Sequence, residues 1–177
     1  IEIPDVLDRS LGDIHPQGNP HVHLDPQIII EAAALIEARL SILDPNNAEI
    51  YKSNLKSFNA RWATALQNWI IAAESLKGKS VITHHKSFSY LLKFLGMNTL
   101  TSLEERPGIP PSARHLAKVV SVIEKTPPLA VITAPYDPDG PNEWVAKKTN
   151  VRVITLPYTI GGSSEATDLF TLYDQTI

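Results

Sequence analysis

The sequence predicts an α/β fold in which a four-stranded parallel sheet is flanked by helices and preceded by a long linker helix. Two observations lead to this prediction. From Ser80 onward, short apolar runs of strand length alternate with segments of helical periodicity, and a helical pattern of about 30 residues precedes them. Strict alternation of strand and helix implies right-handed crossovers, which give a parallel sheet with helices on both faces.

Two helices are predicted before the sheet. Residues 28–43, with the sequence IIIEAAALIEARLSIL, have apolar positions three or four apart and stop at Asp44-Pro45. A second helix is predicted from about Asn47 to Lys77, because an apolar stripe runs along it and Gly78 ends it. At a rise of about 1.5 Å per residue this helix is a rod of roughly 45 Å, which is typical of a helix that spans or buttresses two lobes.

The alternating part of the chain contains four predicted strands and four helices. The strands are Ser80–Thr83, Asn98–Leu103, Ala130–Thr133 and Val151–Thr155, and the helices are Ser87–Leu95, Ala113–Lys125, Asn142–Thr149 and a last helix from about Glu165. Ligands of such sheets gather at the carboxyl ends of the strands. We expect that edge to carry His84 and His85 after the first strand, Glu104-Glu105 after the second, Tyr136-Asp137 after the third and Tyr158-Thr159 after the fourth.

Composition excludes several classes of protein. The formal net charge is −3 and 20% of the residues are charged, so the chain lacks the basic surface typical of nucleic-acid-binding proteins. It has no apolar run of the roughly 20 residues that a membrane-spanning helix needs, and its first ten residues do not have the pattern of a signal peptide. Because the sequence contains no cysteine, any bound metal must be held by nitrogen and oxygen.

Histidines are concentrated near the start of the chain, in and before the segment GNPHVHLDP. His15, His21 and His23 are three of the six histidines and fall within nine positions of a Gly/Pro-rich stretch. Neutral imidazole is the commonest metal ligand, so a metal site is the first hypothesis, and the distant pair His84 and His85 offers further donors. The alternative is that the loop histidines are solvated, that His84 packs at its strand end and that His115 lies on the surface of its helix.

Several separated motifs in one order resemble a known family, the periplasmic metal-binding proteins of cluster A-I ABC importers. These motifs are GDIHPQGNPHVHLDP, LDPNNAEIYKSNLKSFNARW, HKSFSYLLKFLGM, ERPGIPPSARHLAKVV and VITLPYTIGGSSEATDLF. The resemblance implies an extracytoplasmic or periplasmic substrate-binding protein, not an enzyme. Such a protein captures Zn²⁺ or Mn²⁺ as its transported ligand and delivers it to the permease of an ABC transporter, without spanning the membrane itself.

The resemblance also implies metal ligands. The histidine of the family motif that precedes L-D-P corresponds to His21, and the ligand that precedes the x-x-F-x-Y helix corresponds to His85. The GDIH and ERPGIPPS forms are similar to a subgroup of the family and place His15 and Glu104 close to the ion, and Asp139 is a weaker candidate. A family aspartate that follows the last strand falls near Tyr158 or Thr159, and neither of these is a carboxylate.

The family has two α/β lobes joined by a rigid helix, and this comparison divides the chain into parts. Residues 1–26 are expected to form the metal-site loop region, residues 27–78 the helical linker and residues 79–177 the C-terminal lobe. The N-terminal lobe, which usually supplies one more histidine ligand, is absent from these residues. Nitrogen-rich sites favour zinc and carboxylate-rich sites favour manganese, so the metal depends on the full ligand set.

Two other functions remain open at this stage. A metal-dependent hydrolase would use a His/His/Glu site to activate water, although the sequence has no HExxH helix and no recognisable Ser-His-Asp arrangement. A surface adhesin is the other alternative, since some members of this family are surface antigens.

Overall fold

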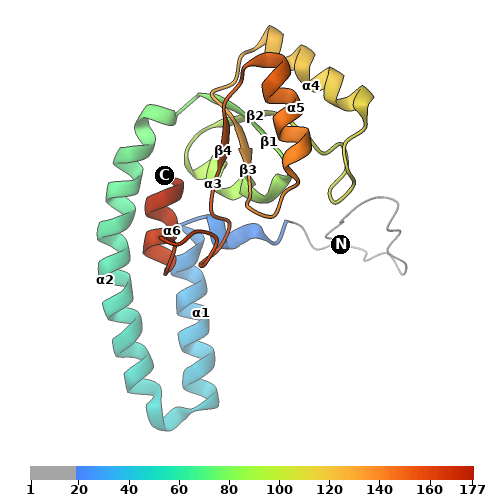
Figure 1. The fold of residues 1–177 in the computed structure, drawn as a ribbon. Coiled ribbons are helices and arrows are strands. Elements are labelled where there is room, and N and C mark those ends of the chain that lie inside the picture. The colour runs from blue at the N-terminus through green and yellow to red at the C-terminus, as the bar shows by residue number, and fades with distance from the viewer. Residues whose placement is uncertain (1–18) are drawn as a thin grey trace, which may run out of the picture.

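The computed structural model describes residues 19–177 and contains the predicted four-stranded parallel sheet (Figure 1). The strands are β1 (Ser80–Thr83), β2 (Asn98–Ser102), β3 (Val131–Thr133) and β4 (Val153–Thr155). Each lies within two residues of its predicted bounds. All three pairings are parallel, so the α/β class predicted from the alternating pattern is confirmed.

The strand order is β2-β1-β3-β4, which places the first strand in the interior of the sheet. The chain leaves β1 toward β2 on one side, and after β2 it crosses back to β3 on the other side of β1. Chain direction across the sheet therefore reverses between β1 and β3. In open parallel sheets, this reversal leaves a crevice at the carboxyl ends of the two strands, where ligands bind. His84 and His85 directly follow β1 and lie at this position.

Helices cover both faces of the sheet, because successive residues of a strand point to opposite sides. Val81 packs in a core with α3 (Ser89–Phe94), which follows the short 3-10 helix η5 (Lys86–Phe88). The next residue, Ile82, packs on the other face with α4 (Ala113–Lys125) and α5 (Asp139–Thr149). The helix α5 begins three residues before the predicted Asn142, since a proline is tolerated in a first turn that has no partner for its N–H.

The two helices that precede the sheet form an antiparallel pair that projects away from it (Figure 1). They are α1 (Ile28–Leu43) and α2 (Ala48–Ala73), and the 3-10 helix η3 (Pro45–Asn47) joins them. The predicted helix to Lys77 is shorter in its α-helical part, because the last turn tightens into the 3-10 helix η4 (Glu74–Leu76) before Gly78, whose φ is +77°. Within residues 19–177, no helix combines the length and apolarity needed to cross a bilayer.

The last helix, α6 (Leu169–Thr176), lies against α2 rather than on the sheet. It begins four residues later than the predicted Glu165, because Asp168 caps it: its side chain accepts a hydrogen bond from the Thr171 backbone N–H at 2.8 Å. Tyr173 of α6 packs with Trp62 and Trp69 of α2 in a buried aromatic cluster. The C-terminal residues therefore belong to the helical part of the structure as much as to the sheet.

The aromatic cluster also holds the histidine segment. The indole N–H of Trp62 donates to the Pro26 carbonyl oxygen at 2.8 Å, and the hydroxyl of Tyr173 donates to the His23 carbonyl oxygen at 2.7 Å. Both aromatic side chains are fully buried. Two backbone carbonyls of the segment before α1 are thus satisfied by side chains of the helical pair and α6, which fixes where this segment lies.

The buried indole predicts a stability difference between two tryptophans. Trp62→Phe leaves the Pro26 carbonyl without its donor and removes volume from a closed cluster, so we expect a loss of about 2–4 kcal/mol in the free energy of unfolding. Trp144→Phe is the control, because that side chain is 39% exposed, and we expect it to change stability by less than about 1 kcal/mol. Urea unfolding monitored by circular dichroism measures both, and equal losses would contradict this description of the cluster.

Candidate metal centre

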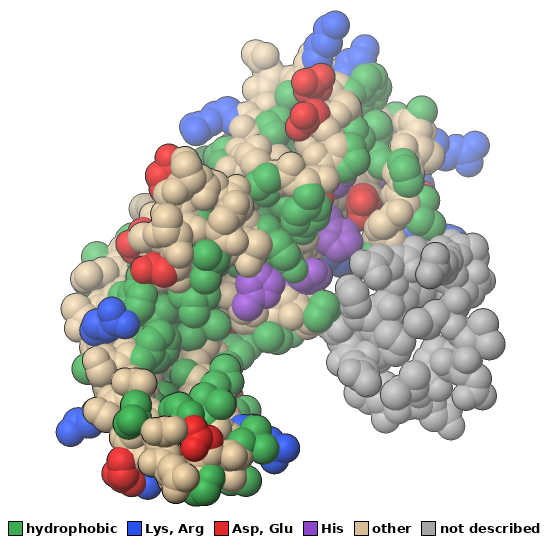
Figure 2. Space-filling model, turned by 60° about the horizontal axis from the view of Figure 1, so that its bottom comes forward, with side chains coloured by type: hydrophobic (Ala, Val, Ile, Leu, Met, Phe, Trp, Pro, Cys, Tyr) green, Lys and Arg blue, Asp and Glu red, His purple; other side chains and the backbone are tan. Residues whose placement is uncertain are grey.

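The structure brings two of the predicted metal ligands together from segments far apart in the sequence. The 3-10 helix η2 (His21–Leu24) lies beside the end of β1, and the rings of His21 and His85 meet edge to face with centroids 6.0 Å apart. His21 is 91% buried, since its relative exposure is 9%. Figure 2 shows histidine side chains grouped in the middle of one face of the molecule. This position is at the carboxyl edge of the sheet, where the strand order reverses.

Hydrogen bonds to Asn19 determine which nitrogen of His21 carries hydrogen. Asn19 Oδ1 accepts from the His21 backbone N–H at 3.0 Å and also contacts the ring Nδ1. Because a backbone N–H can only donate, the Asn19 atom that it faces is the amide oxygen. That oxygen accepts from Nδ1 as well, so Nδ1 carries the hydrogen and Nε2 carries the ring lone pair.

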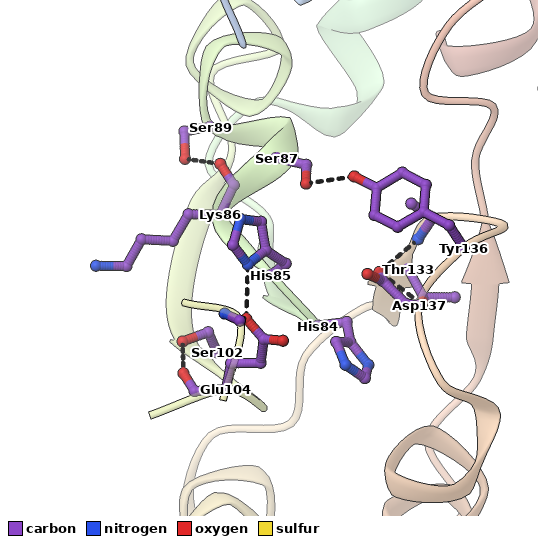
Figure 3. A network of polar contacts seen from close by, with 12 residues as sticks. His84, His85, Lys86, Ser87, Ser89, Ser102, Glu104, Thr133, Tyr136 and Asp137 are labelled. Carbon is purple, nitrogen blue, oxygen red and sulfur yellow. Dashed lines mark hydrogen bonds and ion pairs between the residues drawn. The ribbon is translucent and has the colours of Figure 1, made fainter. Parts of the chain in front are cut away.

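Glu104 holds His85 in the same way (Figure 3). Its Oε2 lies 2.6 Å from Nδ1 of His85 and accepts a second hydrogen bond from the Gly108 backbone N–H at 3.0 Å. Both side chains are largely buried, with 15% of His85 and 13% of Glu104 exposed. A carboxylate at Nδ1 leaves the lone pair of the ring on Nε2, which is the usual arrangement behind histidine ligands of metals.

Tyr158, which follows β4, packs against both histidines of the N-terminal segment. Its ring meets His21 at a centroid distance of 5.5 Å and His23 at 4.9 Å, and its carbonyl oxygen accepts from Nε2 of His23 at 3.1 Å. Tyr136 lies 5.3 Å away, ring to ring, and its hydroxyl bonds to Ser87 Oγ at 2.9 Å. Burial raises the pKa of Tyr158 and of Tyr136, so both remain neutral phenols at physiological pH.

His84 packs at the strand end, as one of the two interpretations of the sequence predicted. Only 1% of its surface is exposed, and its Nδ1 lies 3.0 Å from Oδ1 of Asn142. The amide nitrogen of Asn142 donates to Thr133 Oγ1 at 3.1 Å and to the Pro138 carbonyl at 3.2 Å, so Oδ1 is left to accept from His84. This network holds β1, β3 and the start of α5 together behind the site.

The remaining candidates are placed less directly. His15 lies outside the described residues, and Asp139 is in the first turn of α5. The expectation that His115 is a surface residue is wrong: the residue is half-buried at the start of α4, and its Nε2 bonds to the Ser102 carbonyl at 2.9 Å. Within residues 19–177, no three His, Asp or Glu side chains are arranged to hold one ion.

Asn19 is a residue of this site that sequence reasoning missed. The signal was present in the triplet Asn-Pro-His, because an asparagine side chain often accepts from the backbone N–H two residues later. That rule predicts the turn but not the contact with the His21 ring. The ring contacts of Tyr158 were also missed, since they depend on how the segment after β4 folds over the sheet edge.

Comparison with known proteins matches the chain to one family. The family model described as "ZnuA: Zinc-uptake complex component A periplasmic" matches residues 3–177. The high-affinity zinc uptake system protein ZnuA of Yersinia pestis is 29% identical over 142 residues, which are 80% of this chain and 45% of that protein. The chain therefore spans less than half the length of this relative.

Two solved structures share the fold. A Zn(II)-bound mutant variant of AdcAII from Streptococcus pneumoniae superposes with a TM-score of 0.73 at 27% identity, over 89% of this chain and 58% of that one. FpvC from Pseudomonas aeruginosa in complex with Mn²⁺ superposes with a TM-score of 0.73 at 22% identity, over 89% of this chain and 62% of that one. The second likeness, at this identity, concerns the fold alone.

Proposed function

The chain belongs to the family of ZnuA, the periplasmic zinc-uptake complex component A, and from this premise we propose that it is part of an extracytoplasmic substrate-binding protein. Its transported ligand is a divalent transition metal, with zinc preferred and manganese second. The protein delivers this ion to the permease of an ABC transporter. Family membership, the zinc-uptake relative and the Zn(II)-bound solved structure support this proposal.

The observation that carries the proposal is the facing pair of His21 and His85. Because a zinc ion lies about 2.0–2.1 Å from a histidine nitrogen and roughly 3.2 Å from the ring centre, two shared imidazoles have centroids up to about 6.4 Å apart. The observed 6.0 Å is within this limit. Each ring has an oxygen acceptor at Nδ1, so both would bind the ion through Nε2.

The donor set around this pair favours zinc over manganese. Two imidazole nitrogens are borderline ligands that suit zinc, whereas manganese prefers carboxylate and carbonyl oxygens. The family aspartate falls near Tyr158 or Thr159, and neither of these residues supplies a carboxylate oxygen. Glu104 is the carboxylate in contact with His85, and its Oε2 accepts from both His85 and the Gly108 backbone N–H. We therefore assign Glu104 first to orienting His85, with direct metal contact as the alternative.

We propose that a further lobe covers the helical pair and completes the site. Not one residue of α1 is buried, and four of its large apolar side chains are more than half exposed: Leu35, Ile36, Ile42 and Leu43. An apolar groove of about 370 Å³ runs between α1 and α2. Exposed apolar surface on this scale is typical of an interface. The relatives are long enough to contain a second lobe. That lobe would supply ligands for the coordination positions of the ion that His21, His85 and His15 do not fill.

The first test replaces each histidine. His21→Ala and His85→Ala should each weaken zinc affinity by at least the 10- to 100-fold that loss of even a supporting contact causes. Competition with a chromophoric chelator measures the affinity. Elemental analysis of the wild type should give a fixed zinc stoichiometry without hydrolysis of ester or peptide substrates, and turnover would favour the hydrolase instead.

Controls for this test come from the same part of the fold. His115→Ala removes a histidine that bonds to the Ser102 carbonyl and should leave zinc affinity within about threefold of the wild type. Glu104→Gln keeps an oxygen that accepts from His85, so it should cost less than Glu104→Ala if the residue orients the ring, and as much if it binds the ion. Glu105→Gln, at the exposed neighbour, should change nothing. Unchanged affinity in both His21→Ala and His85→Ala contradicts the proposed site.

Proton competition gives a second prediction. Imidazole binds metal only when neutral, and its ordinary pKa is about 6.5, so zinc affinity should fall steadily as the pH drops below that value. Two histidine ligands make the decline approach two log units per pH unit at the acid end. Affinity measured between about pH 5 and 8 tests this, and a flat profile would show that carboxylates hold the ion.

The two-lobe proposal predicts that this chain and a protein carrying the further lobe differ in zinc affinity. Alone, the 177 residues should bind zinc at least about tenfold more weakly than a protein carrying the further lobe, because fewer protein ligands reach the ion. Zinc affinity and solution mass, measured for both proteins, provide the comparison. A monomeric 177-residue chain that binds as tightly as the longer protein would overturn the proposal.

A further inference from the structure

We propose that Asn19 is a positioning residue of the metal site: it selects the tautomer of His21 and ties the His21 segment to the segment that carries His85. This inference rests on the proposed function, because it takes His21 and His85 as the metal-binding pair. It concerns a residue that binds no metal itself and acts through the two histidine segments.

Asn19 contacts the His21 ring through its side-chain oxygen. Asn19 Oδ1 is identified as oxygen by the backbone N–H that donates to it at 3.0 Å, and the same oxygen contacts Nδ1 of the ring. Free imidazole slightly favours hydrogen on Nε2. An acceptor fixed at Nδ1 reverses that preference and places the ring lone pair on Nε2. Asn19 therefore presents the donor atom before any metal arrives.

Asn19 also contacts the segment that carries His85. The amide nitrogen of Asn19 donates to the carbonyl oxygen of Lys86 at 3.3 Å, and Lys86 is the residue after His85. The Asn19 carbonyl oxygen accepts from the hydroxyl of Tyr90, in α3, at 3.1 Å. One residue thus contacts the segment of each histidine, and these two contacts join positions 67 and 71 residues apart in the sequence.

A purely local role does not account for these contacts. An asparagine that only closed a turn would need its oxygen on the backbone N–H of His21 and nothing more. Three further contacts are present. The Asn19 side-chain nitrogen donates to Lys86, its backbone carbonyl accepts from Tyr90, and the contact with the His21 ring shares the oxygen that the turn requires. The side chain is satisfied on both its oxygen and its nitrogen, which fixes its own orientation and hence that of the ring.

Two variants separate the functions of the two amide atoms. Asn19→Ala removes both, so we expect the His21 tautomer to shift toward hydrogen on Nε2 and zinc affinity to fall 10- to 100-fold. Asn19→Asp keeps an oxygen acceptor for Nδ1 and loses the donor to Lys86. It should therefore preserve the tautomer and retain more of the affinity than Asn19→Ala. Asn54→Ala, at an exposed position of α2, is the matched control and should match the wild type in both respects.

The tautomer is read in the metal-free protein by long-range ¹H–¹⁵N correlation of the imidazole nitrogens, with the His21 signals assigned by their loss in His21→Ala. Zinc affinity is measured by chelator competition, and thermal unfolding of each variant reports folding. Wild-type tautomer and affinity in Asn19→Ala would overturn the inference. Equal affinity losses in Asn19→Ala and Asn19→Asp with an unchanged tautomer would also overturn it, because they indicate a structural role only.

These readouts distinguish this inference from the proposed function. The tautomer is observed without metal, so a shift in Asn19→Ala supports the positioning of His21 whatever the wild type binds. A wild type that fails to bind zinc overturns the proposed function and with it the role of Asn19 in a metal site. The tautomer data still decide whether Asn19 determines which nitrogen of the His21 ring carries hydrogen.

Discussion

The site depends on how firmly the segment of residues 19–26 is held against the sheet edge. This segment forms only one turn of 3-10 helix, so its own hydrogen bonds cannot fix its position. Side chains from elsewhere do so: the indole of Trp62 holds the Pro26 carbonyl, and the hydroxyl of Tyr173 holds the His23 carbonyl. Leu24, fully buried, joins the core on the α3 face of the sheet. Polar and apolar contacts thus hold the segment together, and His21 is part of it.

Sheet topology explains why this edge is where the histidines meet. The reversal between β1 and β3 separates the connections that leave their carboxyl ends, and a short segment from outside the sheet can then lie in the space between them. Behind it, the buried His84 and Asn142 bridge the two strands and α5, so the position of His85 does not depend on a mobile loop. His84 and His85 are adjacent, and their side chains point to opposite sides of the backbone, so the two histidines make different contacts.

The contacts of Glu104 bear on the choice between a binding protein and a hydrolase. A hydrolase of the His/His/Glu kind needs a carboxylate poised to take a proton from a metal-bound water. Here one carboxylate oxygen already accepts from both His85 and the Gly108 backbone N–H. That arrangement orients the His85 ring and ties Glu104 to the loop after β2. An oxygen engaged in this way is less suited to taking a proton from water, which supports the proposal of a binding protein over that of a hydrolase.

Sequence patterns predicted the order of the elements because each depends on local periodicity, and the bounds of β1, α1 and α4 were predicted to the residue. Motif position and strand-end placement likewise predicted that His21 and His85 meet. The tautomers were not predicted: that of His21 follows from a ring contact with Asn19 that the local turn rule does not specify, and that of His85 follows from Glu104, 19 residues along the chain. The place of α6 was also missed. Its aromatic residues have the same helical spacing whether they pack on the sheet or on α2, and only the matching surface of Trp62 and Trp69 decides between the two. Local patterns therefore predicted which histidines lie together, while the side chains that contact their rings are seen only in the folded structure.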